Sequence, residues 1–129
     1  MMWTTALRAR LIADTAVAAK VGTRIDWTVR PQGSPLPAIV LTKVSDGRPQ
    51  HLKGFETLRQ SRVQIDVLAS SRSQVEQITE AVIAAIAGPF NQSGVQFSRT
   101  FIDTVTDRGA STDTGFVHRD LIDALIWHN

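Results

Sequence analysis

The chain has 129 residues, of which 43% are hydrophobic and 20% are charged, and its formal net charge is only +2. These values are typical of a single folded domain and differ from those of a disordered segment or a strongly basic nucleic-acid-binding protein. The chain has no cysteine, which excludes disulfides, thiolate catalysis, iron–sulfur clusters and cysteine-based zinc sites.

The first predicted element is an amphipathic helix from Thr4 to about Lys20. Threonines at its start can cap it, and Leu7 and Leu11 fall on one face. Gly22 follows as a suitable terminator. We expect this helix to pack on a sheet.

Two strands are predicted next. Arg24–Trp27 reads as a short strand, and Pro31–Pro37, with three prolines and one glycine, reads as an extended connection. Ala38–Val44 is rich in β-branched residues, which favours a strand. Ser45–Thr57 is polar and longer than a tight hairpin needs, so we expect a loop, and loops of this length are often functional.

The middle of the chain carries the clearest patterns. Leu58–Ala69 is predicted to be a strand with one buried face, because Val63, Ile65 and Val67 alternate strictly with the polar residues Arg62, Gln64 and Asp66. Ser71 with Gln74 and Ser73 with Glu76 both match a capping box. They open a helix whose apolar residues recur at helical spacing until Gly88-Pro89 ends it.

The pattern of the C-terminal part of the chain predicts a second hairpin. From Val95 onward a period of two places one set of residues on a common face: Val95, Phe97, Arg99, Phe101, Asp103 and Val105. Arg108–Thr114 reads as a loop. Phe116–Trp127 matches both a strand and a helix, and we prefer a strand because it would pair with the preceding segment.

The predicted order is therefore α-β-β-α-β-β. Two hairpins joined by a helix predict a single α+β domain over residues 1–129, with one antiparallel sheet and helices packed on one of its faces.

Signatures of catalysis are missing from the sequence. The three histidines, His51, His118 and His128, have no metal-ligand spacing, and no nucleophile elbow, phosphate loop or dinucleotide fingerprint occurs. The longest apolar run, Ala81–Ala87, is far shorter than the roughly 20 residues that a membrane helix needs, and no secretory signal is recognisable. We expect a non-enzymatic protein without metal or cofactor, folded in a cytoplasm.

A nucleic-acid-binding module is one alternative. Arg48, Lys53, Arg59 and Arg62 lie within fifteen residues around Phe55, and such modules combine basic and aromatic side chains. A solvated loop and one polar strand face explain the same residues equally well. A small enzyme with a site that the sequence does not reveal is a second alternative.

Several segments resemble the phage tail-completion, or tail-terminator, proteins. The resemblance rests on Ala6–Asp14 followed by Val21–Ile25, on Pro31–Leu41, on Arg62–Val67 before the capped helix, and on Thr114–Leu121. It implies an α+β subunit that forms rings, typically hexameric, at the end of a tail tube. Such a ring stops tube growth and presents a surface to the head–tail connector.

The resemblance also implies where and with what the protein works. Its partners would be copies of itself, the tail tube protein and the head–tail connector protein, with DNA only as cargo passing through the ring and no membrane. It would assemble in the bacterial cytoplasm and end in a virion, a prophage-encoded particle or a gene-transfer particle. Another connector or tube component remains an alternative.

A ring subunit needs adhesive surfaces, and the two polar loops Ser45–Thr57 and Arg108–Thr114 can provide them. We therefore expect the contacts with neighbouring subunits or with the tube to involve a set of charged and aromatic loop residues: Arg48, His51, Lys53, Phe55, Arg59 and Arg108.

Overall fold

The computed structural model describes residues 2–48, 50–51, 54–55, 58–113 and 115–129. They form three helices: α1 (Trp3–Ala13), α2 (Thr15–Val21) and α3 (Arg72–Ile86). The strands are β1 (Ile25–Trp27), β2 (Ala38–Asp46), β3 (Gln50–His51), β4 (Gly54–Phe55), β5 (Arg59–Ala69), β6 (Phe90–Gln92), β7 (Val95–Asp107), β8 (Ala110–Thr112) and β9 (Gly115–His128).

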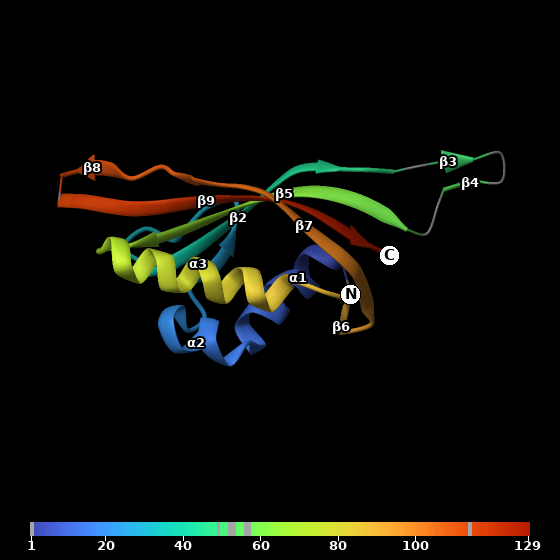
Figure 1. Cartoon of the computed structure of the whole chain (residues 1–129), viewed down its shortest axis with the longest axis horizontal. Coiled ribbons are helices and arrows are strands. Elements are labelled where there is room, and N and C mark those ends of the chain that lie inside the picture. The colour runs from blue at the N-terminus through green and yellow to red at the C-terminus, as the bar shows by residue number, and fades with distance from the viewer. Residues whose placement is uncertain (1, 49, 52–53, 56–57, 114) are drawn as a thin grey trace.

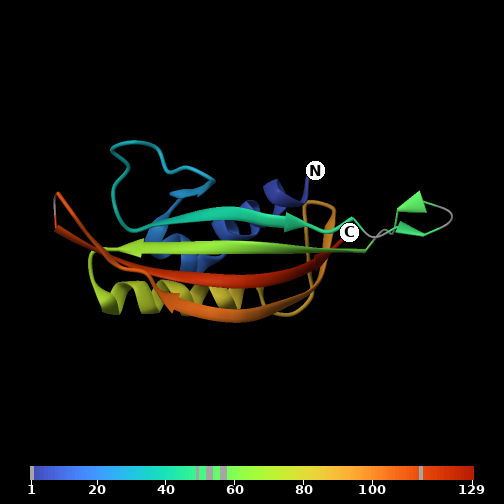
Figure 2. The same cartoon turned by 90° about the horizontal axis from the view of Figure 1, so that it is seen from above.

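Seven of these strands form one sheet in the order β1-β2-β5-β9-β7-β6, with β8 paired to β9. Every pair in it is antiparallel except β1 and β2, which run parallel over three residues. The long strands twist as they cross the molecule (Figure 2). The predicted α+β class and the strand at Phe116–Trp127 are confirmed, and the short parallel strand is the exception to the antiparallel sheet.

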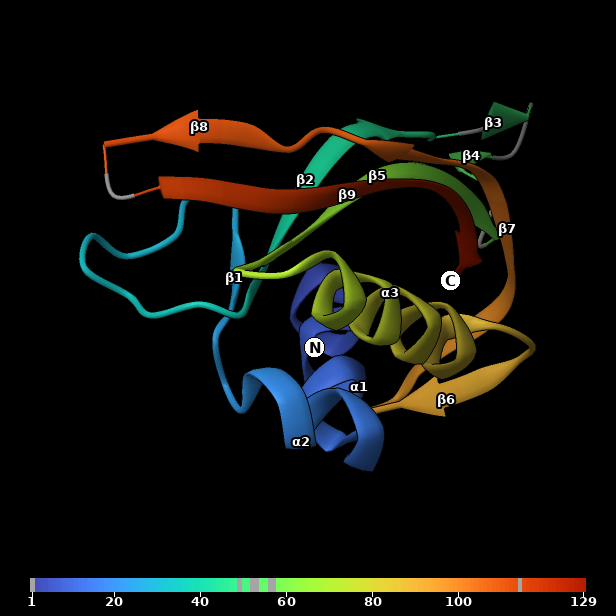
Figure 3. The ribbon, with the colours of Figure 1, turned by 60° about the vertical axis from the view of Figure 1, so that its left-hand side comes forward.

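All three helices lie on one face of the sheet, as predicted, and the other face is open (Figures 1 and 3). The core forms between these layers. At its centre Leu41, Ile65 and Ile122 are neighbours on β2, β5 and β9, and all three are fully buried. The strict alternation of β5 produces this arrangement, because residues two apart share a face.

The first helical segment is two helices rather than one. Asp14 has extended backbone angles, and its carboxylate accepts a hydrogen bond from the Val17 backbone N–H at 3.0 Å, so it caps α2. The prediction of a single helix from Thr4 to Lys20 missed this break. The expected threonine cap is also wrong, because α1 begins after Met2 without a side-chain cap. Gly22 ends α2 with a positive φ of 58°, as expected.

Helix α3 uses the first of its two possible caps. The Ser71 hydroxyl accepts a hydrogen bond from the Gln74 backbone N–H at 3.2 Å, and Ser73 lies inside the helix. The apolar face of α3 packs on the sheet through Val75, Ile78 and Val82, each fully buried.

Strand β7 departs from its predicted pattern because it contains two bulges. Its register with β9 shifts between Phe97 and Arg99 and again between Ile102 and Thr104. Each extra residue moves the following side chains to the other face. Phe97 is therefore fully buried under the helices, whereas Phe101 lies 47% exposed on the open face. The prediction of one common face for the odd-numbered residues from Val95 to Val105 is wrong.

The two segments expected to be loops contain paired strands. Beyond β2 and β5 the chain forms a separate two-stranded sheet of β3 and β4. We call residues 47–58 the β3–β4 arm. At the opposite end of the molecule β8 pairs with the start of β9 and extends the sheet (Figure 1). The molecule is therefore elongated, with one hairpin projecting from each end.

Candidate functional site

The base of the β3–β4 arm is held by a single carboxylate. Asp46, the last residue of β2, accepts a hydrogen bond from Arg48 at 3.1 Å and lies 3.7 Å from Nη1 of Arg59 and 3.8 Å from Nζ of Lys43. The Asp46 side chain is only 11% exposed, whereas that of Arg48 is 57% exposed. The carboxylate therefore draws three cations to the point where the arm leaves the sheet.

The same carboxylate connects the arm to the core. The Trp3 indole N–H reaches Oδ2 of Asp46 at 3.5 Å, and the Ser61 hydroxyl lies 3.3 Å from Oδ1. Ser61 also lies 2.9 Å from Nε2 of His128, and Nδ1 of His128 lies 2.9 Å from the Asn129 carbonyl. Helix α1, β5 and β9 are thus joined at the arm base, a connection that the spacing of these residues in the sequence does not reveal.

This network contains a serine, a histidine and an aspartate, yet its geometry is not that of a catalytic triad. In a triad the carboxylate orients the imidazole. Here Asp46 contacts Ser61 instead, and His128 turns its other nitrogen to Asn129. Both Ser61 and His128 are fully buried, so a substrate cannot reach either. The arrangement serves to satisfy polar groups in the core.

The environment shifts the pKa values of two members of this network. Burial opposes ionisation of Asp46, but the hydrogen bond from Arg48 and the charge of Arg59 outweigh it and lower the pKa of Asp46 below 3.8. Burial lowers the pKa of His128 below 6.5, against a smaller opposing effect of the Asn129 carbonyl. Asp46 is therefore charged and His128 neutral at neutral pH.

The structure brings some of the predicted interface residues together and separates others. Arg48 and Arg59 meet at Asp46, and His51 and Phe55 belong to β3 and β4 of the arm. Lys53 lies outside the described residues. Arg108 follows β7 at the other end of the sheet, where β8 begins.

A shallow pocket of about 510 Å³ opens beside the arm base. Its lining includes Leu58 and Trp127, together with Arg48 and Arg59. Leu58 is 49% exposed. An exposed apolar surface rimmed by arginines is typical of a protein contact.

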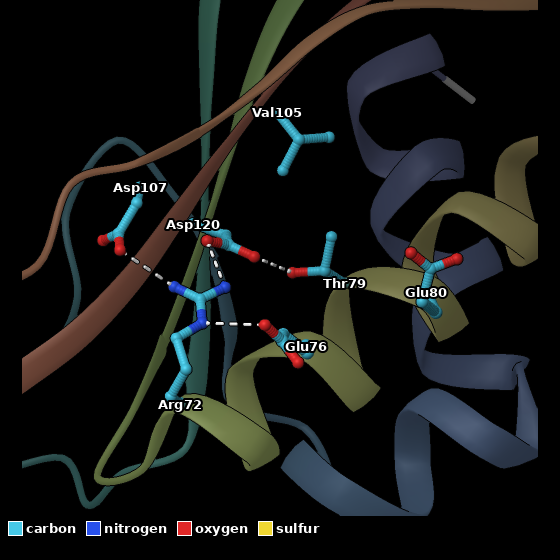
Figure 4. Close-up of a pocket in the computed structure, with 7 residues that line it drawn as sticks. All are labelled: Arg72, Glu76, Thr79, Glu80, Val105, Asp107 and Asp120. Atoms are coloured by element: carbon cyan, nitrogen blue, oxygen red, sulfur yellow. Dashed lines mark hydrogen bonds and ion pairs between the residues drawn. The ribbon is translucent and has the colours of Figure 1, made fainter.

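The opposite end of the molecule carries an acidic pocket of about 590 Å³ on the helix face, between α3 and β7 (Figure 4). Arg72 is its only cation, and it contacts Asp120 at 2.7 Å, Glu76 at 3.2 Å and Asp107 at 3.3 Å. Asp120 is 4% exposed and also accepts a hydrogen bond from the Thr79 hydroxyl at 3.0 Å. Three carboxylates thus contact one guanidinium, and Glu80 lines the same pocket farther from Arg72 (Figure 4).

A third pocket, of about 320 Å³, lies on the open face at the same end. We call it the arginine pocket, because its lining combines three arginines with small and apolar residues: Arg30, Val40, Leu68, Arg108, Ala110, Thr112, Val117 and Arg119. Arg119 bonds to Asp66 at 2.8 Å. Sequence reasoning found only Arg108 of the three arginines, because the fold alone brings the others to it.

The described part of the chain holds no group of three or more histidine, cysteine or acidic residues arranged to bind a metal ion. No helix among the described residues has the length and hydrophobicity required to cross a membrane.

Comparisons with known proteins identify relatives of the chain. Residues 5–121 match the protein family described as tail completion protein gp17. A solved chain from the virion of a native gene transfer agent particle has 18% sequence identity and a TM-score of 0.67, with 97% of this chain and 93% of that chain covered. A second solved chain has 14% identity and a TM-score of 0.58, covering 100% of this chain and 97% of its own. No curated protein matches the chain in sequence.

Proposed function

The chain belongs to the tail completion protein gp17 family, and on that premise we propose that it forms a ring which ends the tail tube and joins it to the head connector. It is a structural protein of a phage tail or of a phage-like particle. The observation that carries the proposal is the family match, which spans 117 of the 129 residues, from 5 to 121.

The shape of the subunit supports a ring. A closed ring requires each subunit to offer two different surfaces, one to each neighbour. This chain has an open sheet face, a helix-covered face and hairpins that project from opposite ends (Figure 1).

The ring size, the partners and the place of assembly are proposed from the resemblance to tail-completion proteins. We propose a hexameric ring with the tail tube protein on one side and the head–tail connector protein on the other. The ring assembles in the bacterial cytoplasm, and DNA passes through it only as cargo. We propose that the protein needs no cofactor and turns over no substrate.

We propose that the β3–β4 arm and the pocket beside its base make part of the contacts between the ring subunits and their partners. Arg48 and Leu58 are exposed there, and His51, Lys53 and Phe55 belong to the same segment. Arg59 holds the base of the arm through Asp46. Arg108 contributes at the other end of the molecule.

Removing the gene from cells that produce the particle tests the proposal. We expect filled heads separate from tails, and tails of irregular length, in electron micrographs of the lysate. Supplying the gene in trans restores joined particles of uniform length. Complete absence of tails would instead identify a tube component, and joined particles of normal length would contradict the proposed function.

A further inference from the structure

At the β8 end of the sheet, opposite charges lie on opposite faces of the same two strands. On β9, Asp120 contacts Thr79 and Arg72 of α3, so it lies on the helix face, and the adjacent Arg119 therefore lies on the open face. On the neighbouring strand, Asp107 also contacts Arg72, and the next residue, Arg108, lines the arginine pocket. The backbone N–H of Arg108 donates to the Arg119 carbonyl at 2.8 Å, which fixes the two strands side by side.

The helix face at this end is acidic and accessible. Asp107 and Glu76 are 67% and 65% exposed at their side chains, and Glu80 is exposed on the next turn of α3. The described lining of this pocket contains four carboxylates and one cation, Arg72, so this surface keeps a net negative charge (Figure 4).

The open face at this end has the complementary character. The arginine pocket has three guanidinium groups and no acidic residue in its lining. Arg119 is paired with Asp66, and the Arg30 guanidinium donates to the Ser34 carbonyl at 3.1 Å. Among the described residues, the Arg108 side chain has no carboxylate partner. The arginine pocket is also lined by Val40, Leu68 and Val117. These residues give it an apolar surface that a phosphate ion or a nucleic-acid backbone would not use.

We propose that the arginine pocket is the docking site for the acidic helix face of a second copy of this chain. Identical faces repel each other in this arrangement, because the charged side chains of each face at this end leave a net charge of one sign, negative on the helix face and positive at the arginine pocket. Opposite faces attract, so the contact is heterologous, and heterologous contacts close into rings when the rotation between subunits permits it. This inference rests on the proposed ring and names the surfaces through which its subunits touch.

Zero-length cross-linking in finished particles tests the contact. In an Arg108→Lys variant the charge is retained, and carbodiimide treatment can join the introduced amine to a carboxylate in direct contact with it. We expect mass spectrometry to find it joined to Glu76 or Glu80. Those residues lie on the other face of the same chain, so such a bond must connect two copies. Particles in which the introduced amine joins neither of them would overturn the proposal.

An exchange of charges between Arg108 and its carboxylate partner provides a second test. Arg108→Glu should lower the yield of finished particles about tenfold or more, as expected for a close charge pair at an interface. Replacing the cross-linked carboxylate by arginine in the same chain should restore the yield to within a few-fold of the original. Arg99→Glu is the matched control, because Arg99 is an exposed arginine of the same sheet that lies over Trp127 and away from the arginine pocket, and the second change should not rescue it.

The outcomes separate this inference from the proposed function. If gene removal leaves heads and tails unjoined but no such cross-link forms, the function stands and this contact is wrong. If particles join normally without the gene, the proposed function fails, and the cross-link still decides whether copies meet through these faces. Loss of yield in Arg108→Glu without any rescue would favour a different partner for the arginine pocket and overturn the proposal.

Discussion

The imidazole of His128 stacks on the indole of Trp3, with ring centroids 4.5 Å apart and ring planes inclined by 23°. Both rings are buried, and both are linked to Asp46, Trp3 directly and His128 through Ser61. Helix α1 and strand β9 are thereby fixed to the point where the β3–β4 arm begins. The arm therefore extends from a rigid base rather than from a loose loop.

Mild acidification should destabilise the protein through His128. Burial lowers the pKa of this imidazole below 6.5, so the unfolded chain binds a proton at a higher pH than the folded chain does. The stability that neutral His128 contributes is present above the unfolded pKa and is lost as the pH falls through the folded pKa. We expect a lower melting temperature at about pH 5.5 than at about pH 7.5, measured by circular dichroism.

Histidine variants separate this effect from general acid sensitivity. His128→Gln should lower the melting temperature at both pH values but reduce the difference between them. His118→Gln, which changes a partly exposed histidine against Phe116, should leave the difference as it is in the unchanged chain. An unaltered pH dependence in His128→Gln would contradict the assignment.

The two phenylalanines of β7 should respond very differently to truncation. Phe97→Ala removes a fully buried ring that stacks on Phe90 at 4.6 Å, so we expect a loss of about 3–5 kcal/mol in the free energy of unfolding. Phe101→Ala removes a ring that is 47% exposed, and the loss should stay below about 1 kcal/mol. Urea denaturation measures both, and similar losses would contradict the bulge that separates the two faces.

The buried carboxylate of Asp120 should contribute more to stability than the exposed carboxylates around Arg72. Asp120→Asn removes the charge that Arg72 contacts at 2.7 Å, and we expect a loss of about 2 kcal/mol in the free energy of unfolding. Glu76→Gln changes the exposed end of the same cluster and should cost less than about 0.5 kcal/mol. Equal effects in denaturation experiments would show that burial does not decide the strength of this cluster.

Changes in the arm should affect assembly without affecting folding. Strands β3 and β4 form a sheet of their own, apart from the large sheet, so the double change Lys53→Ala and Phe55→Ala should leave the melting temperature within about 2 °C of the original. The yield of joined particles should fall, counted by electron microscopy. A comparable double change on the exposed side of α2, Lys20→Ala with Thr15→Ala, serves as the surface control. Normal tail length and infectivity in the arm variant would reject a contact role for it.

Much of the fold follows from local patterns in the sequence. The alternation in β5 and the spacing of apolar residues in α3 each specify one buried face, and both elements form as predicted. The segment at Phe116–Trp127 matched the periodicity of a strand and also that of a helix. In the structure it pairs with β5 and β7 and is therefore a strand. Local patterns cannot show such pairing, because it depends on residues far apart in the chain.

The features that the sequence analysis missed also depend on contacts that local patterns do not show. The bulges at Ser98 and Asp103 leave no mark on composition. The first moves the following residues, Phe101 among them, to the other face of the sheet, and the second moves the residues after it back. The break at Asp14 depends on one side chain that competes for a backbone N–H. Of the candidate site, sequence reasoning identified charged residues near the arm and Arg108, but not Asp46, Asp120 or the arginine pocket. Each of these gathers residues from three or more elements.

The two bulges have a further consequence for a protein that must associate with selected neighbours. Beyond β6, no described strand covers the outer edge of β7, and a flat edge of that length would invite any extended chain to add to it. Ser98 and Asp103 interrupt the regular spacing of backbone donors and acceptors along this edge. The bulges thereby make this edge of the sheet a poorer template for the addition of a strand from another chain.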